Sequence, residues 1–232
     1  MTTVSRKTPT RDDIMKKTEP QIQLRIVDQE KHLFLSERMD DAECYFKFIV
    51  LAPNSDVTFD ESIHKQALVS LHEALMKESM EWHNDLIKNP EYKDRTPPSI
   101  RWDLEKAVAT TLNQEEIRSL ALTQNAMRKY PLYGAFREPP YGTNFKDGDS
   151  EAHKLFYEWI DFLGIQEQDN INVIDWVHGI DYEWINNDDA IPGRESWSDY
   201  FDAGLEWWGV WCLTIWNPKR RTISALIAST TD

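Results

Sequence analysis

The chain has only two cysteines, Cys44 and Cys212, and each lies within an apolar, strand-like run. Disulfide-stabilised secreted proteins are much richer in cysteine, and neither residue belongs to a C-x-x-C pair of the zinc or redox type. We therefore expect two buried free thiols in a protein of the reducing cytoplasm.

Long apolar runs are also missing. No stretch approaches the roughly 18 consecutive apolar residues that a membrane-spanning helix needs. The segment Met1–Lys17 is polar and basic, and it lacks the apolar core of a secretory signal peptide. The sequence thus predicts a protein that neither enters nor crosses a membrane.

The common catalytic motifs are absent as well. The sequence contains no G-x-S-x-G nucleophile elbow, no phosphate-binding loop with G-x-x-x-x-G-K-[ST], and no H-E-x-x-H zinc helix. We accordingly expect no enzyme, no catalytic residues, no bound metal and no cofactor.

Basic residues are scarce in one part of the chain. Residues Asp147–Glu206 hold sixteen Asp or Glu against Lys154 and Arg194, which accounts for the whole net charge of −14. Six of the ten tryptophans lie in this segment or directly follow it: Trp159, Trp176, Trp184, Trp197, Trp207 and Trp208. Disordered acidic tails are poor in aromatic residues, so we expect a folded acidic surface. A pI near 4.9 argues against nucleic acid as the ligand and favours a basic protein partner.

Hydrophobic patterns predict the main elements. Alternation indicates strands at Gln21–Asp28, at Glu43–Leu51 and at Ile171–Val177, followed by a C-terminal hairpin of Gly209–Trp216 and Thr222–Ser229. Three main helices are expected, one capped by Asp60, one from Asn113 to Tyr130, and one from Ser150 to Leu163 ended by Gly164. The order predicts an α+β fold with an antiparallel sheet. Residues 1–20 are expected to form a flexible N-terminal arm, and residues 21–232 a single α+β domain.

The acidic segment supplies the candidate binding residues. We expect its carboxylates to meet lysines or arginines of a partner and one or two aromatic side chains to fill apolar pockets. Trp184 and Trp197 flank a polar loop and are the better candidates for exposed anchors, although core packing is the favoured interpretation for any single one of them. The predicted partner-binding set is Asp175, Asp181, Glu183, Trp184, Asp188, Asp189, Glu195, Asp199 and Asp202.

Two alternatives stay open from the residues alone. Asp175-x-x-His178-x-x-Asp181 has spacing that could hold a divalent metal, which would make the chain a metal-dependent hydrolase, although Gly179 disfavours a helical ligand face. The acidic residues could instead mimic nucleic acid and inhibit a DNA-binding enzyme.

The acidic, Trp-rich segment is followed by the closing sequence Trp211-Cys212-Leu213-Thr214-Ile215-Trp216-Asn217-Pro218, and the chain ends with Ser229-Thr230-Thr231-Asp232. In these features the second half resembles bacterial cytosolic immunity proteins of polymorphic or contact-dependent toxin systems. The resemblance covers about residues 150–232. It concerns the general character of the sequence and not a specific family motif, so it assigns a function to no individual residue. It implies neutralisation of a cognate protein toxin, commonly a basic nuclease or another enzyme that acts in the cytosol.

Overall fold

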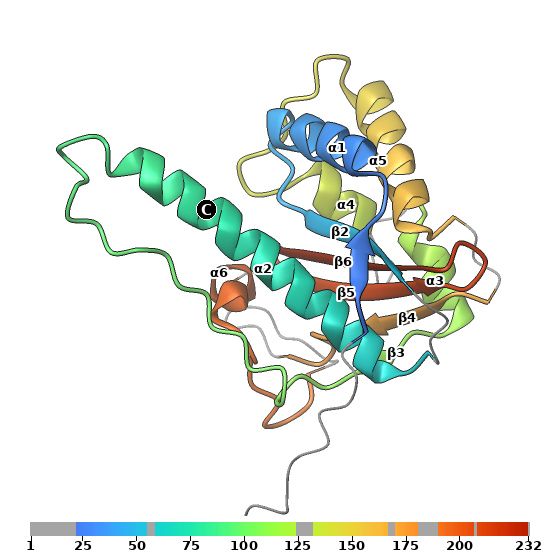
Figure 1. Cartoon of the computed structure of the whole chain (residues 1–232). Helices are drawn as coiled ribbons and strands as arrows, with labels where there is room; N and C mark the ends of the chain where they lie inside the picture. The colour runs from blue at the N-terminus through green and yellow to red at the C-terminus, as the bar shows by residue number, and fades with distance from the viewer. Residues whose placement is uncertain are drawn as a thin grey trace, which may run out of the picture.

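The computed structural model describes residues 22–54, 59–123, 132–166, 170–180, 190–206 and 208–231. Within these ranges, six strands form one antiparallel sheet in the order β1-β2-β6-β5-β4-β3 (Figure 1). The strands are β1 (Leu24–Ile26), β2 (Lys47–Pro53), β3 (Thr110–Thr111), β4 (Asn172–Asp175), β5 (Val210–Asn217) and β6 (Thr222–Ser229). The predicted α+β class, with its antiparallel sheet and C-terminal hairpin, is confirmed. The predicted N-terminal arm lies outside the described residues.

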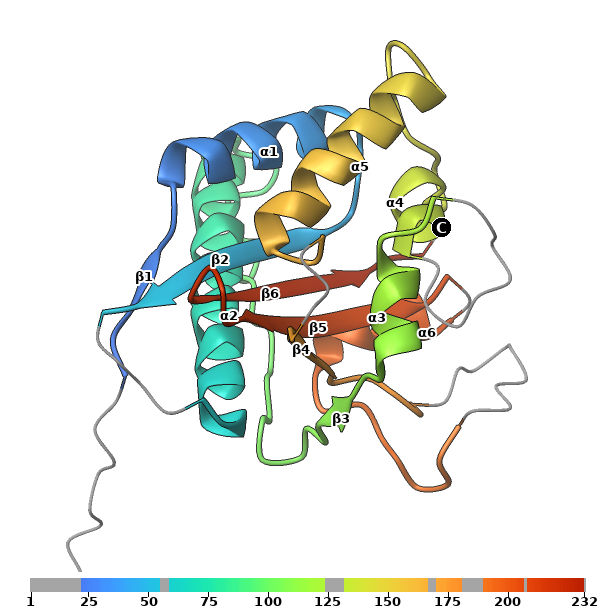
Figure 2. The same cartoon turned by 90° about the vertical axis from the view of Figure 1, so that its right-hand side faces the viewer.

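Helices cover both faces of the sheet. They are α1 (Gln29–Asp41), α2 (Glu61–Leu86), α3 (Gln114–Leu120), α4 (Leu132–Arg137), α5 (Asp149–Leu163) and α6 (Asp202–Leu205), with a 3-10 turn η1 at Asp199–Phe201. Figure 2 shows α1, α3, α4 and α5 on the near face and α2 behind the sheet. Among the described residues, no helix combines the length and apolar character that crossing a membrane would require.

Each face of the sheet has its own hydrophobic core. On the face with α5, the fully buried Trp159 ring packs against Phe46, Phe136 and Phe156, with ring centroids 5.1 to 6.1 Å apart. On the opposite face, α2 contributes Ile63, Ala67, Leu68, Leu71 and Leu75 to a core that also contains residues of β2, β5 and β6. Because the sheet is covered on both sides, its central strands are apolar on both faces.

The β5–β6 hairpin occupies the centre of the sheet, as the apolar character of its first strand predicts. Along β5, Leu213 and Ile215 point to the α5 side, whereas Cys212 points to the α2 side. Both cysteines are buried free thiols, as expected.

The helix boundaries follow local signals where these are strong. The Asp60 carboxylate caps α2 by accepting from the Ser62 amide at 2.9 Å, and Asn113 and Glu116 form the predicted capping box at the start of α3. However, α3 ends at Leu120 instead of Tyr130, and residues 124–131 lie outside the described ranges. The spacing of Trp82, seven residues after Leu75, predicts that it continues the buried apolar stripe of α2, but its side chain is 58% exposed near the end of the helix.

Besides the four-residue α6, the helices α1 and α4 are not predicted by the pattern. Helix α1 buries only Leu35 and Met39, so its apolar periodicity is weak, and its N-cap Asp28 is in a left-handed conformation. Helix α4 is six residues long and lies in a Pro- and Gly-rich region that the sequence favours as an irregular connection. Both are stabilised mainly by tertiary burial, which short sequence windows do not report.

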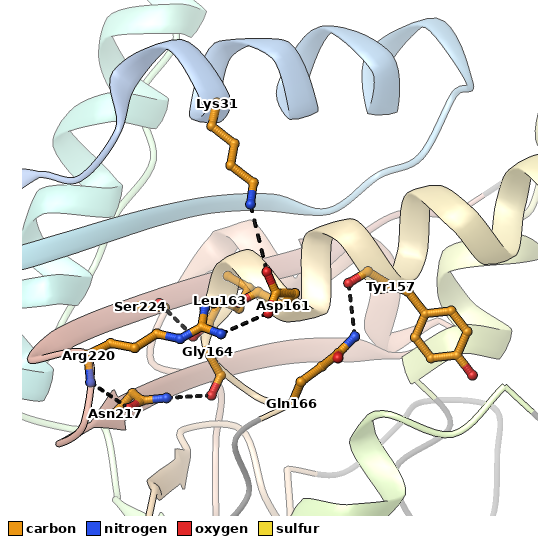
Figure 3. Close-up of polar contacts among 9 residues, drawn as sticks. All are labelled: Lys31, Tyr157, Asp161, Leu163, Gly164, Gln166, Asn217, Arg220 and Ser224. Atoms are coloured by element: carbon orange, nitrogen blue, oxygen red, sulfur yellow. Dashed lines mark hydrogen bonds and ion pairs between the residues drawn. The ribbon is translucent and has the colours of Figure 1, made fainter.

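The C-terminal end of α5 is tied to the hairpin turn (Figure 3). Gly164 adopts the left-handed conformation expected of a helix C-cap, with φ 83°. The Arg220 guanidinium bonds both the carboxylate and the main-chain carbonyl of Asp161, and the Asn217 amide donates to the Gly164 carbonyl at 2.9 Å. These contacts satisfy carbonyl groups that the helix end leaves without partners and place a cation at the negative end of its dipole.

Candidate binding surface

Residues 190–206, the last described part of the acidic segment, are anchored in the core by Trp197. Its side chain is 2% exposed, and its indole N–H donates to the Trp176 carbonyl at 2.8 Å. Its ring also makes edge contacts with Trp102 and Phe201, at centroid distances of 5.1 and 5.0 Å. Trp197 is therefore not an exposed anchor but belongs to the core on the α2 side, which is the interpretation that the sequence favours for a single tryptophan.

The backbone on either side of Trp197 is fixed to a distant loop. The Asp103 amide donates to the Trp197 carbonyl at 2.9 Å, and Ser198 forms an isolated bridge with Trp102. The Asp199 carboxylate accepts from the Arg101 amide at 2.8 Å. Residues 197–199 are consequently positioned by hydrogen bonds to residues 101–103.

The carboxylates of this part point outward. Glu195, Asp199 and Asp202 are exposed, the last of these in the first turn of α6. Glu206 is half-buried and accepts from the Thr231 hydroxyl at 2.7 Å. The segment thus combines a buried aromatic anchor with exposed negative charge.

Asp175 does not belong to this surface. It lies at the end of β4 and is only 5% exposed, and its Oδ1 accepts from the Val177 amide at 2.9 Å. The neighbouring side chains of Ile174 and Trp176 are also buried, so the strand offers Asp175 no solvent-facing position. Its inclusion in the predicted binding set is corrected on this ground. The remaining members, Asp181, Glu183, Trp184, Asp188 and Asp189, lie outside the described residues.

Asp175 and His178 also belong to the possible divalent-metal site of the hydrolase alternative. His178 Nδ1 lies 3.9 Å from Asp175 Oδ2, which is longer than a hydrogen bond. Within the described ranges, no three His, Cys, Asp or Glu side chains are grouped so as to hold a metal ion. Asp181, the third member of the predicted constellation, lies outside those ranges.

Half-buried aromatic side chains at one end of the sheet are better placed as anchors than Trp197. Trp208 and Trp211 pack with ring centroids 4.6 Å apart, and Trp208 also contacts Tyr45 at 6.4 Å. All three are partly accessible. The Trp207-Trp208 doublet was a signal for them, since adjacent residues of an extended chain cannot both enter one core.

A buried polar network lies beneath α2. The Thr214 hydroxyl is 2.7 Å from His64 Nδ1 and accepts from the Trp176 indole at 2.7 Å. His64 is 2% exposed, and burial lowers its pKa to about 4. This histidine is therefore neutral at pH 7 and joins α2 to the central strand β5.

Comparison of the chain with protein-family models, curated proteins and solved structures finds no match.

Proposed function

We propose that this chain is an immunity-type binding protein, which neutralises a cognate basic toxin in the cytoplasm through its acidic, Trp-containing segment. The proposal rests on the arrangement of residues 195–202, which combine one buried aromatic side chain with three exposed carboxylates. Trp197 turns inward and fixes the segment, while Glu195, Asp199 and Asp202 project into solvent.

This arrangement suits an electrostatic inhibitor. Grouped negative charge costs stability through self-repulsion, and a cationic partner relieves that cost. Carboxylates held on a fixed backbone can occupy positions that substrate phosphates take in a basic cleft, and so speed association and set the register of the complex. Here the hydrogen bonds to residues 101–103 supply the fixed backbone.

Aromatic side chains supply the apolar part of such an interface. Tryptophan and tyrosine are enriched among the residues that dominate binding energy. Trp208, Trp211 and Tyr45 combine a packed ring with partial accessibility, and they are our candidates for this role.

The proposal is tested by affinity capture of the tagged chain from its native lysate, with washes at low and high salt and mass spectrometry of the retained proteins. We expect one stoichiometric basic protein whose retention weakens with salt. Its association rate with the double variant Glu195→Lys, Asp202→Lys should fall at least tenfold at low salt and lose most of its salt dependence.

A charge-matched control separates local from global electrostatics. Glu91 and Asp94 are exposed on a different loop, so Glu91→Lys with Asp94→Lys makes the same change in net charge. If both double variants slow association equally, only the net charge matters, and the acidic segment is not the binding surface. A captured partner that is neutral or acidic would contradict the proposal directly.

A further inference from the structure

An apolar groove runs beside β1, the edge strand of the sheet. It has a volume of about 600 Å³ and is lined by Leu24 and Ile26 of β1, by Ile49 and Leu51 of β2, and by residues of α1 and α2. A smaller hollow of about 290 Å³ shares Leu24, Ser70 and Glu73 with it and extends to Ile22. The two hollows are adjacent along α2 and are called the channel below, and no residue of 190–206 lines either of them.

The length of the channel suits an extended peptide. Its lining on α2 runs from Gln66 to Glu81. At a rise of ~1.5 Å per helical residue this distance is roughly 22 Å. An extended chain covers it with roughly six or seven residues at ~3.3 Å each.

One side of the channel is a sheet edge. In the described part of the chain, β1 pairs with β2 alone, and its ladder covers only residues 51–53 of that strand. Beyond this point the Val50 carbonyl accepts from the Val27 amide at 2.9 Å, and the Phe48 carbonyl accepts from His32 Nε2 at 3.1 Å. Ile26 and Val69, which line the channel, are 43% and 41% exposed. An edge strand with accessible apolar neighbours is a template for strand addition.

The charges around the channel favour a basic occupant. Four carboxylates line it, those of Asp40, Glu73, Glu78 and Glu81, against two lysines. Lys47 is already bound to Asp40 at 3.0 Å and to Glu78 at 2.7 Å, and Lys77 lies 3.9 Å from Glu81. Glu73 makes no ion pair among the described residues.

A buried polar atom also lacks a partner at the far end. Gln66 lines the smaller hollow, and its Oε1 is buried with no hydrogen-bond partner in the described structure. A buried amide oxygen without a donor is costly, so a donor on an occupant would stabilise this end.

We propose that this channel docks an extended segment of a partner protein, six to seven residues long, in which lysines or arginines are interspersed with apolar residues. The segment adds a strand to the outer edge of β1. Its apolar side chains cover the exposed Ile26 and Val69, and its cations meet Glu73. This docking surface is separate from the acidic segment of the proposed function.

The test uses a fluorescein-labelled peptide of alternating lysine and valine, eight residues long, and fluorescence anisotropy with the full chain. We expect it to bind at least tenfold more tightly than the peptide of alternating glutamate and valine. Ala74 is exposed on α2 and lines the channel, so Ala74→Trp should fill it and weaken binding at least tenfold. Asn84→Trp, at an exposed position of the same helix outside the lining, should leave binding unchanged.

Backbone methylation distinguishes strand addition from simple charge attraction. Only every second amide of an added strand faces β1. Of two peptides methylated at the odd or the even amides, one should therefore lose binding at least tenfold and the other should retain it. As a second variant, Glu73→Lys should weaken binding more than the charge-matched Glu37→Lys, which lies outside the lining.

Three results would overturn the proposal. The first is that the lysine–valine peptide does not bind. The second is that it binds equally to Ala74→Trp and Glu73→Lys, or that both methylated peptides bind like the parent. The third is a dimer in size-exclusion light scattering that Ala74→Trp abolishes, which would assign the channel to a second copy of the chain.

Discussion

The indole N–H of Trp197 donates a 2.8 Å hydrogen bond to the main-chain carbonyl of Trp176. This contact joins the loop of the acidic segment to the end of β4, and both side chains are at most 2% exposed. The negative surface is therefore built outward from the hydrophobic core. Four predictions follow from the contacts of individual buried residues.

Replacing Trp197 by phenylalanine should destabilise the fold by about 1–3 kcal/mol, because it leaves the buried Trp176 carbonyl without its donor. Urea unfolding monitored by circular dichroism measures the change. Trp82→Phe is the matched control, since Trp82 is 58% exposed, and it should shift stability by less than about 0.5 kcal/mol. Equal effects of the two changes would show that the Trp197 hydrogen bond contributes nothing.

The free energy of unfolding should decrease as the pH falls, because His64 is buried in its neutral form. Burial lowers its pKa in the folded state to about 4, below the ~6.5 of an unfolded histidine. The unfolded chain therefore takes up the proton first as the pH falls. The contribution of neutral His64 is fully present above about pH 6.5 and is lost progressively down to about pH 4, by roughly 3 kcal/mol in all. Urea unfolding between pH 7.5 and 4.5 should show a flatter dependence in His64→Gln, and an unchanged slope would contradict the assignment.

Gly164→Ala should lower the free energy of unfolding by roughly 2 kcal/mol or more. The residue has φ 83°, which disfavours a Cβ, and the added Cβ would lie 3.1 Å from Asn217 Nδ2. Gly142→Ala is the control because Gly142 has φ 74° but no atom within 4 Å of an added Cβ. That change should carry the backbone penalty alone, about 1 kcal/mol. Thermal unfolding of the two variants compares them, and an equal loss would exclude a role for the Asn217 contact.

Neither thiol should react in the native protein. Burial raises the pKa of Cys44 to about 12 and raises that of Cys212 as well, so little thiolate forms at neutral pH. Titration with Ellman's reagent should detect two thiols in guanidinium chloride and none within minutes in buffer. Rapid labelling of the native chain would mean that the region around one of the two cysteines opens readily.

Signals within a few residues of sequence determine much of the fold without long-range contacts. The Asp60 cap, the Asn113–Glu116 capping box and the Gly164 C-cap act within a few residues, so they mark helix ends in the sequence itself. Alternation likewise placed Cys44, Phe46, Phe48 and Val50 on one face, and all four lie in the core on the α5 side. Helix α1 escaped prediction because only two of its residues are buried.

The candidate binding surface could be predicted only in part from the sequence. The sequence by itself determined how much negative charge the segment carries and that large aromatic residues accompany it. Only the tertiary structure decided which way those side chains face. Asp175 and Trp197 are buried, whereas Glu195, Asp199 and Asp202 are exposed, because burial depends on contacts with Trp102 and with β5, which lie far away in the sequence.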